Sequence, residues 1–169
     1  MHNLLQYLQG GDLRSIAGAN TVVTLIKSQQ HFDGLMSFLF SKDRLVVMRA
    51  ADAIEKITLQ KPEYLTAHSH TIVNLMDTAV DKELKWHLAL MAPRLHLSSE
   101  ALEIVWNQLT DWAKDQKESK IVRVNAIQAL FELSRTNNNL KSALDLTIQD
   151  LKTDKSKSIQ ARLRKLTGT

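Results

Sequence analysis

Histidines are the side chains of this sequence that are best suited to acid–base or metal chemistry. His68 and His70 stand two residues apart, and on a helix that spacing directs two side chains to different faces. Zinc needs three or four converging nitrogen, sulfur or carboxylate ligands, and the chain has no cysteine. The sequence therefore predicts solvated polar side chains at this point, with no metal and no cofactor.

A third histidine, His87, is of the residue type that most often acts as a general base. Nucleophilic catalysis also needs a serine, threonine or cysteine held against such a base, and no spacing in the sequence fixes one beside His87. Glycine-rich phosphate loops and a His-Glu-x-x-His segment are absent as well. The sequence favours a protein that is not an enzyme.

The segment around His87 has the pattern of an amphipathic helix. Between Glu83 and Leu95, apolar residues recur at helical spacing and form one continuous stripe: Leu84, Leu88, Met91, Ala92 and Leu95. The other face is mixed in character and carries Trp86, His87, Leu90 and Arg94. An aromatic side chain with a cation nearby is typical of a surface that binds a partner.

The same layout returns at a fixed interval, which indicates a repeat architecture. Residues 46–57, 84–95 and 122–133 can be superposed in sequence at a period of 38, and Asp43 and Asp81 precede the first two as candidate helix caps. A weaker copy starts at Asp12, and a partial copy covers 159–166. This pattern predicts stacked helix pairs.

The expected helices follow from these periods and from local start and stop signals. A short first helix would be capped by Asn3, and Pro93 should kink or end the central helix. The further helices are expected near 21–28, 32–41, 45–58, 65–79, 82–96, 100–114, 121–134, 140–151 and 158–166.

The third copy carries a recognisable motif. Its segment Val122-Arg123-x-x-Ala126-x-x-Ala129-Leu130 resembles the second-helix signature of HEAT repeats. The arginine position of that motif is Arg123 here, Lys85 in the preceding copy and Val47 in the one before it. Arg49-Ala-Ala-Asp52, Trp86-His87 and Pro93-Arg94-Leu95 are also similar to small stand-alone bacterial HEAT-repeat proteins of unassigned role.

The resemblance implies an all-α fold, a right-handed α-α superhelix (α-solenoid) of about four to five HEAT-like helix pairs that forms one domain over residues 1–169. In such a superhelix the second helix of each pair faces the concave side. The predicted partner-binding surface on that side is Arg49, Asp52, Trp86, His87, Leu90, Arg94, Asn125 and Gln128. The leading interpretation is a non-catalytic scaffold that binds a protein or peptide there.

Two alternatives to that interpretation remain. The first is purely structural, with Trp86 wedged between neighbouring helices and Arg49 paired with Asp52 or Glu55. The second is nucleic-acid binding or DNA repair, because alkylpurine DNA glycosylases built from HEAT-like repeats use concave-face Trp, Asp and Arg. Trp86, Asp52 and Arg49 or Arg94 look like that set, although Leu90 replaces an acid four residues after Trp86.

Charge is concentrated at the end of the chain. Residues 141–169 carry seven Lys and Arg against three Asp, whereas the remaining residues hold fifteen of each sign, so the net charge of +4 belongs to this segment. We call the cations Lys155, Lys157, Arg162, Arg164 and Lys165 the basic patch. It fits either a solvated face on the last repeat or a surface for nucleic acid or an acidic partner.

Composition also bears on location. The start MHNLLQYLQGGD has neither a basic lead nor a long apolar run, which argues against a signal peptide. The longest apolar cluster, near 35–40, is far shorter than the ~18 residues that a membrane-spanning helix needs. The sequence predicts a cytoplasmic protein that does not enter a membrane, and it makes no prediction about oligomeric state.

Overall fold

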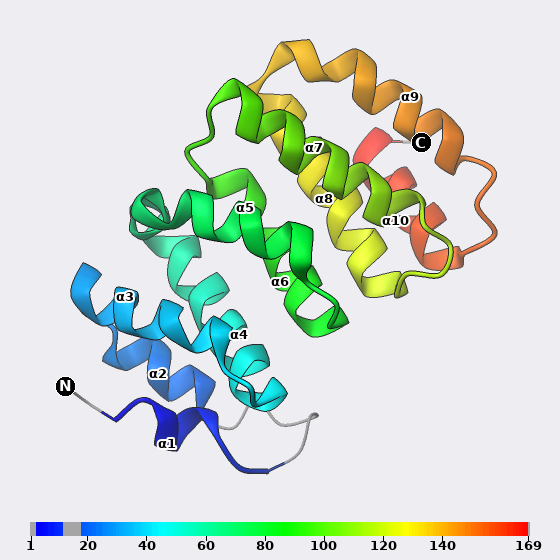
Figure 1. Ribbon diagram of the computed structural model, residues 1–169. Helices are drawn as coiled ribbons and strands as arrows, with labels where there is room; N and C mark the ends of the chain where they lie inside the picture. Colours follow the sequence, from blue (N-terminus) through cyan, green and yellow to red (C-terminus); the bar gives the residue numbers. More distant parts are fainter. Residues whose placement is uncertain (1–2, 12–17, 169) are drawn as a thin grey trace. The chain divides into compact units, whose positions relative to one another are not determined.

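The computed structural model describes residues 3–11 and 18–168, and within these ranges it consists of helices and their connections, with no strand (Figure 1). The all-α prediction is therefore confirmed. The α-helices are α1 (Leu5–Leu8), α2 (Ala19–Leu25), α3 (Gln29–Met36), α4 (Arg44–Gln60), α5 (Ser69–Thr78), α6 (Lys82–Met91), α7 (Ser99–Lys114), α8 (Lys120–Thr136), α9 (Lys141–Leu151) and α10 (Lys157–Thr167). Short 3₁₀ helices are η1 (Ser37–Phe40), η2 (Pro62–His68), η3 (Ala92–Arg94) and η4 (Asn138–Leu140).

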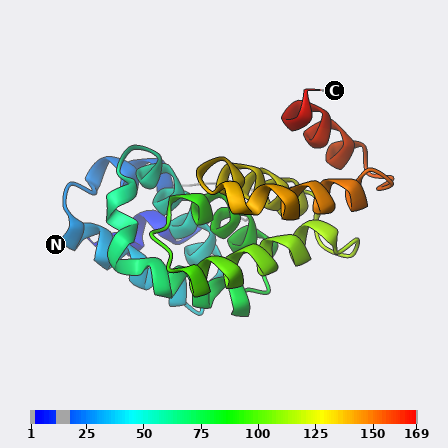
Figure 2. The ribbon, with the colours of Figure 1, turned by 90° about the horizontal axis from the view of Figure 1, so that it is seen from above.

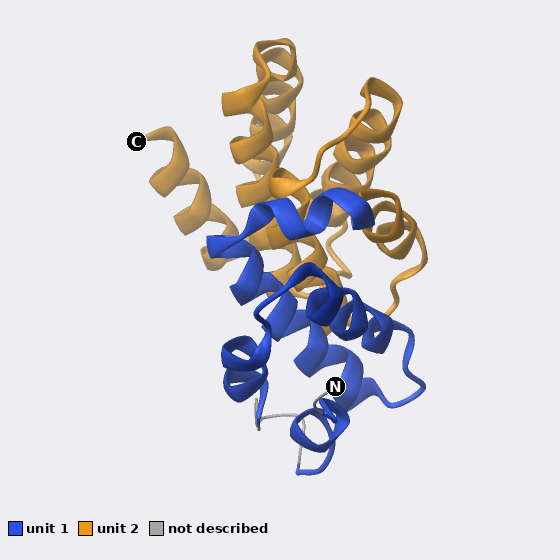
Figure 3. Ribbon diagram, turned by 90° about the vertical axis from the view of Figure 1, so that its left-hand side faces the viewer, with its two compact units in different colours: residues 1–68 blue, residues 69–169 orange. Residues whose placement is uncertain are grey.

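Contacts within the chain group into two compact units, Met1–His68 and Ser69–Thr169 (Figure 3). Each unit has its own buried apolar side chains, so each is described separately. The single repeat domain expected over residues 1–169 stays a prediction. Among the described residues, no helix is both long and apolar enough to cross a lipid bilayer.

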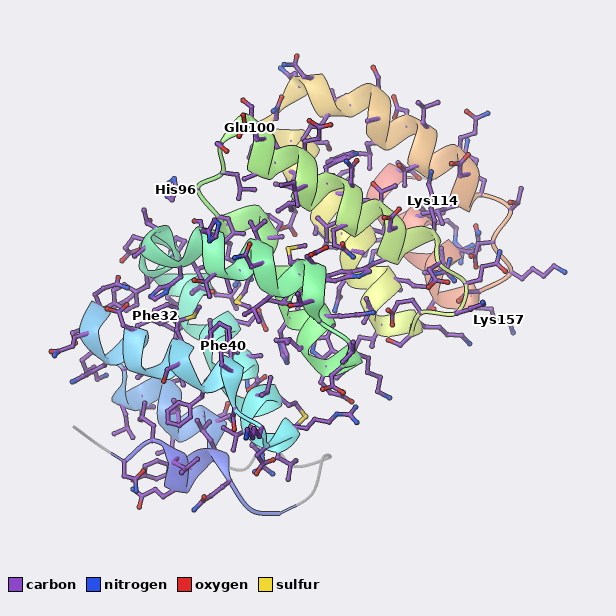
Figure 4. All side chains as sticks on the ribbon, in the orientation of Figure 1. Phe32, Phe40, His96, Glu100, Lys114 and Lys157 are labelled. Atoms are coloured by element: carbon purple, nitrogen blue, oxygen red, sulfur yellow. The ribbon has the colours of Figure 1, made fainter. Side chains whose placement is uncertain are left out.

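The first unit is built around α4, which packs against α1, α2, α3, η1 and η2. Small residues on α4, Ala50 and Ala53, are fully buried and let these neighbours approach closely. Phe32 from α3 is also fully buried, whereas Phe40 at the end of η1 is largely exposed (both labelled in Figure 4). The core of this unit therefore lies on several faces of one long helix.

In the second unit the helices form two rows. The first row is α5, α7 and α9, in which α7 contacts both of the others. The second row is α6, α8 and α10, in which α8 contacts both of the others, and α7 also packs along α8. Figure 2 shows α9 in orange and α10 in red as the last pair of this unit, with their axes crossing steeply.

The period of the sequence appears in the helix starts. Helices α4, α6, α8 and α10 begin at Arg44, Lys82, Lys120 and Lys157, which are 38, 38 and 37 residues apart. Asp43 caps α4, as expected, because its side chain accepts a hydrogen bond from the Leu45 N–H at 2.9 Å. Asp81 is the N-cap residue of α6, but its side chain makes no capping hydrogen bond.

Several expected boundaries differ from the structure for local reasons. Helix α6 ends at Met91 and continues only as the 3₁₀ turn η3, because Pro93 has no N–H to extend the α-helical pattern. Asn3 is not a cap, since α1 begins after Leu4 without a side-chain capping bond. The weaker repeat copy that begins at Asp12 starts outside the described residues.

Candidate binding surface on the second unit

Helix α6 is oriented by its apolar stripe. Leu84, Leu88 and Met91 are buried, while Trp86 and Leu90, about a quarter-turn or more away from that stripe, are half-buried. The predicted division of α6 into a core face and a second face is thus correct for these residues. Trp86 is therefore partly accessible to a partner on a helix that is fixed by its core side.

His87 does not belong to the accessible face. Its side chain is buried, and its ring lies 5.4 Å from the Trp86 ring, centre to centre, with the two planes tilted by 55°. His87 therefore offers little surface to a partner, and its predicted partner contact stays a prediction. The reason for its burial is that His87 lies one helical turn from Leu84 and Met91, which are buried, so its side chain is at the core-side edge of the apolar stripe.

The next helix of the row, α8, adds half-buried polar groups. Asn125 and Gln128 are both half-buried, and the Gln128 amide donates to the Glu132 carboxylate at 2.8 Å. Arg162 on α10 in turn donates to the side-chain oxygen of Gln128. Gln128 of the predicted partner-binding surface and Arg162 of the basic patch are thus bonded to each other and tie α10 to α8.

Two ion pairs connect successive helix pairs of this unit. Lys85 on α6 pairs with Glu118, which precedes α8, and Arg123 on α8 pairs with Asp154, which precedes α10. Arg123 Nε also donates to the Ala113 carbonyl at 3.0 Å. Sequence reasoning noted the motif position shared by Lys85 and Arg123 but missed the acids, although each stands shortly before the next helix of the row.

The Arg123–Asp154 pair is almost completely buried, with exposed side-chain fractions of 4% and 7%. The hydrogen bond from Arg123 lowers the pKa of Asp154 below its ordinary value, against the opposing effect of burial. The backbone N–H of Ser156 adds a second hydrogen bond to that carboxylate at 2.8 Å. Asp154 is therefore held ionised at neutral pH by two donors.

The two predicted surface residues of the first unit have structural contacts instead. Arg49 is fully buried on α4, and its guanidinium donates to the carbonyl oxygens of Leu8 and Gly10. Its side chain reaches the end of α1 and offers no surface to a partner in this structure, so the predicted partner contact of Arg49 stays a prediction. Asp52 is half-buried and pairs with Lys56 one turn along α4 at 2.7 Å.

Arg94 and the members of the basic patch divide into half-buried and exposed side chains. Arg94 is half-buried at the end of η3. In the basic patch Arg162 is half-buried and bonded to Gln128, as described above. The other four members are exposed on α10 or just before it: Lys155, Lys157 (labelled in Figure 4), Arg164 and Lys165.

The paired histidines do not converge. The Nε2 of His68 lies 2.7 Å from the carboxylate of Asp33 in the first unit, and the Nδ1 of His70 lies 3.3 Å from the amide of Asn74 in the second. The structure, over the residues it describes, has no group of three metal-ligating side chains. Hydrogen bonds from Gln29 and then His68 lower the pKa of Asp33.

Comparisons with models of protein families, with curated proteins and with solved structures give no match for this chain. The resemblance to HEAT repeats thus rests on the sequence motif and the period, and membership of that family stays a prediction. What the second unit presents is a two-row helical body with a half-buried tryptophan on one row and exposed cations at its end.

Proposed function

We propose that this protein is a non-catalytic, cytoplasmic binding module of the HEAT-like superhelical type, and that its second unit binds another protein on the row α6–α8–α10. The observation that carries the proposal is the half-buried Trp86 on a helix whose opposite face is fixed in the core. Partly exposed tryptophan is expensive to leave in water and is over-represented among residues that dominate protein–protein affinity.

The neighbours of Trp86 along the row fit a protein ligand. Val124 and Leu90 are half-buried apolar side chains, and Ile121 is 45% exposed. Asn125 supplies a polar group beside them. Apolar groups with a polar rim are the usual composition of a protein interface. The internal period also supports the expectation that equivalent positions on successive helices of the row expose their side chains on the same side.

The ion pairs described above support the rigidity that such a surface needs. Lys85–Glu118 and Arg123–Asp154 each fasten a helix of the row to the loop before the next one. A row whose members are fixed in register loses less conformational entropy when it binds than a mobile one. The surface around Trp86 is therefore preorganised.

A second candidate function, nucleic-acid binding, is favoured by one observation. The four exposed cations of the basic patch, Lys155, Lys157, Arg164 and Lys165, are gathered around a single short helix. Phosphate contacts by such side chains give binding that weakens steeply as salt rises. The glycosylase-like version loses support, because the buried Arg49 is engaged with backbone carbonyls and Asp52 with Lys56.

The experiment compares variants of the full chain against a partner and against DNA. A partner is captured from a lysate, purified and titrated against the wild type, Trp86→Ala and Leu146→Ala. Leu146 is 65% exposed on α9, in the other row, and serves as the matched apolar control. Trp86→Ala should weaken binding by about 2 kcal/mol or more, and Leu146→Ala should leave the affinity unchanged.

Duplex and single-stranded DNA are titrated in parallel at two salt concentrations, using a variant with Lys155, Lys157, Arg164 and Lys165 changed to Gln. Tight, salt-sensitive DNA binding that these changes abolish would favour the nucleic-acid function instead. Equal loss of partner binding in Trp86→Ala and Leu146→Ala would contradict the proposed surface.

A further inference from the structure

A cavity in the first unit is lined by none of the residues considered above for a macromolecular partner. Its volume is about 260 Å³, and it is bounded by the start of α1, the end of α2, α3 and η1. The apolar part of its lining is Leu4, Leu25, Ile26 and Phe38. No Lys, Arg, Asp or Glu is among its described lining residues, so the cavity suits an uncharged occupant.

Gly34 on α3 is one of the residues that line this cavity. It lies within the α-helix, its φ is not positive, and a Cβ placed on it would meet no atom within 4 Å. Glycine inside a helix is less favourable than alanine. Neither backbone conformation nor a close neighbour requires glycine here, and what its missing side chain provides is space in the cavity that it lines.

His31 is the polar feature of the same wall. Its Nδ1 is shielded from solvent and has no hydrogen-bond partner within the part of the chain that the structure describes. A buried polar atom without a partner is destabilising. Gln30, the preceding residue on α3, also lines the cavity and offers an amide. A ligand that carries one hydrogen-bonding group beside an apolar body would complement this wall.

We propose that this cavity binds a small, neutral ring compound with a single hydrogen-bonding group. Size sets the class: a dry cavity of about 150 Å³ lined by aliphatic and aromatic side chains holds benzene, and the cavity here has room for two fused rings. Phe38 offers one aromatic wall, Leu4, Leu25 and Ile26 add aliphatic surface, and the polar groups come from Asn3, Gln30, His31 and Ser37. The inference is independent of the protein-binding function, because every residue it uses belongs to the first unit.

Indole is the probe, titrated into the full chain by calorimetry and by ¹H–¹⁵N NMR. We expect saturable binding, with amide shifts concentrated in α2, α3 and η1. Indole-3-acetate, which places a carboxylate on the same rings, should bind at least about tenfold more weakly, since no cation lines the cavity to pair with it.

Substitutions at Gly34 test whether the space itself is the site. Gly34→Leu should weaken indole binding by about tenfold or more by filling the cavity. Gly34→Ala should weaken it less and raise the melting temperature, because alanine favours the helix. Ala67→Leu, which also introduces a leucine but at an exposed position of η2, should leave binding unchanged.

The absence of saturable indole binding, or equal affinity in the wild type and a folded Gly34→Leu, would overturn the proposal. If circular dichroism shows that Gly34→Leu is unfolded, Gly34→Ala decides the question. A more stable Gly34→Ala variant that binds indole as tightly as the wild type would refute the assignment.

Discussion

Each unit of this chain buries an arginine, and the hydrogen bonds described for the two arginines go to different acceptors. In the first unit, Arg49 donates to two backbone carbonyl oxygens at the end of α1. In the second, Arg123 is paired with the carboxylate of Asp154. Carbonyl oxygens do not titrate, whereas a carboxylate can be protonated or removed by a single substitution. The second unit therefore contains a buried arginine whose connection depends on an acidic side chain.

The two buried arginines stand at different positions of their helices, and this explains why they reach different acceptors. The motif position that is occupied by Lys85 in α6 and by Arg123 in α8 is occupied by Val47 in α4. The buried cation of α4 is instead Arg49, two residues later, which faces another side of its helix. A shift of two positions is enough to send a guanidinium to a different neighbour, so similar helices need not share their connections.

The largest effect is expected from removing the buried acid of the second unit. Asp154→Ala leaves Arg123 buried without its carboxylate and should lower the free energy of unfolding by about 3–5 kcal/mol. Urea unfolding followed by circular dichroism measures it. The matched control is Lys114→Ala, whose pair with Asp150 is exposed, at 40% and 59%, and which should change stability by less than about 1 kcal/mol.

If Asp154→Ala and Lys114→Ala lowered the free energy of unfolding by similar amounts, the buried Arg123–Asp154 pair would stabilise the protein no more than the exposed Lys114–Asp150 pair. The contrast between the units would then lose its energetic basis.

Replacing the buried cation of the first unit should cost less. Arg49→Met keeps much of the apolar stem but leaves the Leu8 carbonyl, which is buried, without this donor, and the expected loss is about 1–3 kcal/mol. Hydrogen exchange should rise first in α1, because Arg49 bonds the end of that helix. Faster exchange confined to α10, with α1 unchanged, would contradict the assigned contacts.

Acid should act on the two units through different groups. The pKa of Asp154 is lowered in the folded protein, so its stabilising contribution is complete above the ordinary aspartate pKa of about 4 and is lost as the pH falls through the folded value. Exchange protection of α8 and α10 should therefore weaken on acidification.

In Asp154→Asn this pH dependence should be smaller, because the titrating carboxylate is gone. Asp33 in the first unit also has a lowered pKa and acts in the same direction, but it is half-exposed, so its effect should be weaker. An unchanged acid response of α8 and α10 in Asp154→Asn would refute the role of this carboxylate.

Much of the fold was accessible from apolar spacing. The period of 38 predicted the starts of α6 and α8 relative to α4, and the stripe containing Leu88 predicted the buried face of α6. Such patterns are readable because helical geometry repeats every 3.6 residues and burial selects residue type. The 3₁₀ segment after Met91 follows similarly from Pro93.

The candidate surface was less accessible for a physical reason. A helical wheel places Arg49 and His87 outside the apolar stripe, but it contains no information about which neighbour lies beyond that face. Arg49 is buried by the end of α1, which is far from it in sequence, and His87 is buried beside Leu88. Whether a long polar side chain at the edge of an apolar stripe is buried or exposed depends on tertiary contacts, which the pattern of one helix does not contain.

Fluorine NMR tests the proposed surface most directly. The chain has three tryptophans, of which Trp106 and Trp112 are buried and Trp86 is half-buried. Full-length protein labelled with 5-fluorotryptophan should show three resonances, and Trp86→Phe assigns one of them. Adding the purified partner should shift the Trp86 resonance and leave the other two in place. A partner that binds while the Trp86 resonance stays unchanged would contradict the proposal that this protein recognises its ligand on the row α6–α8–α10.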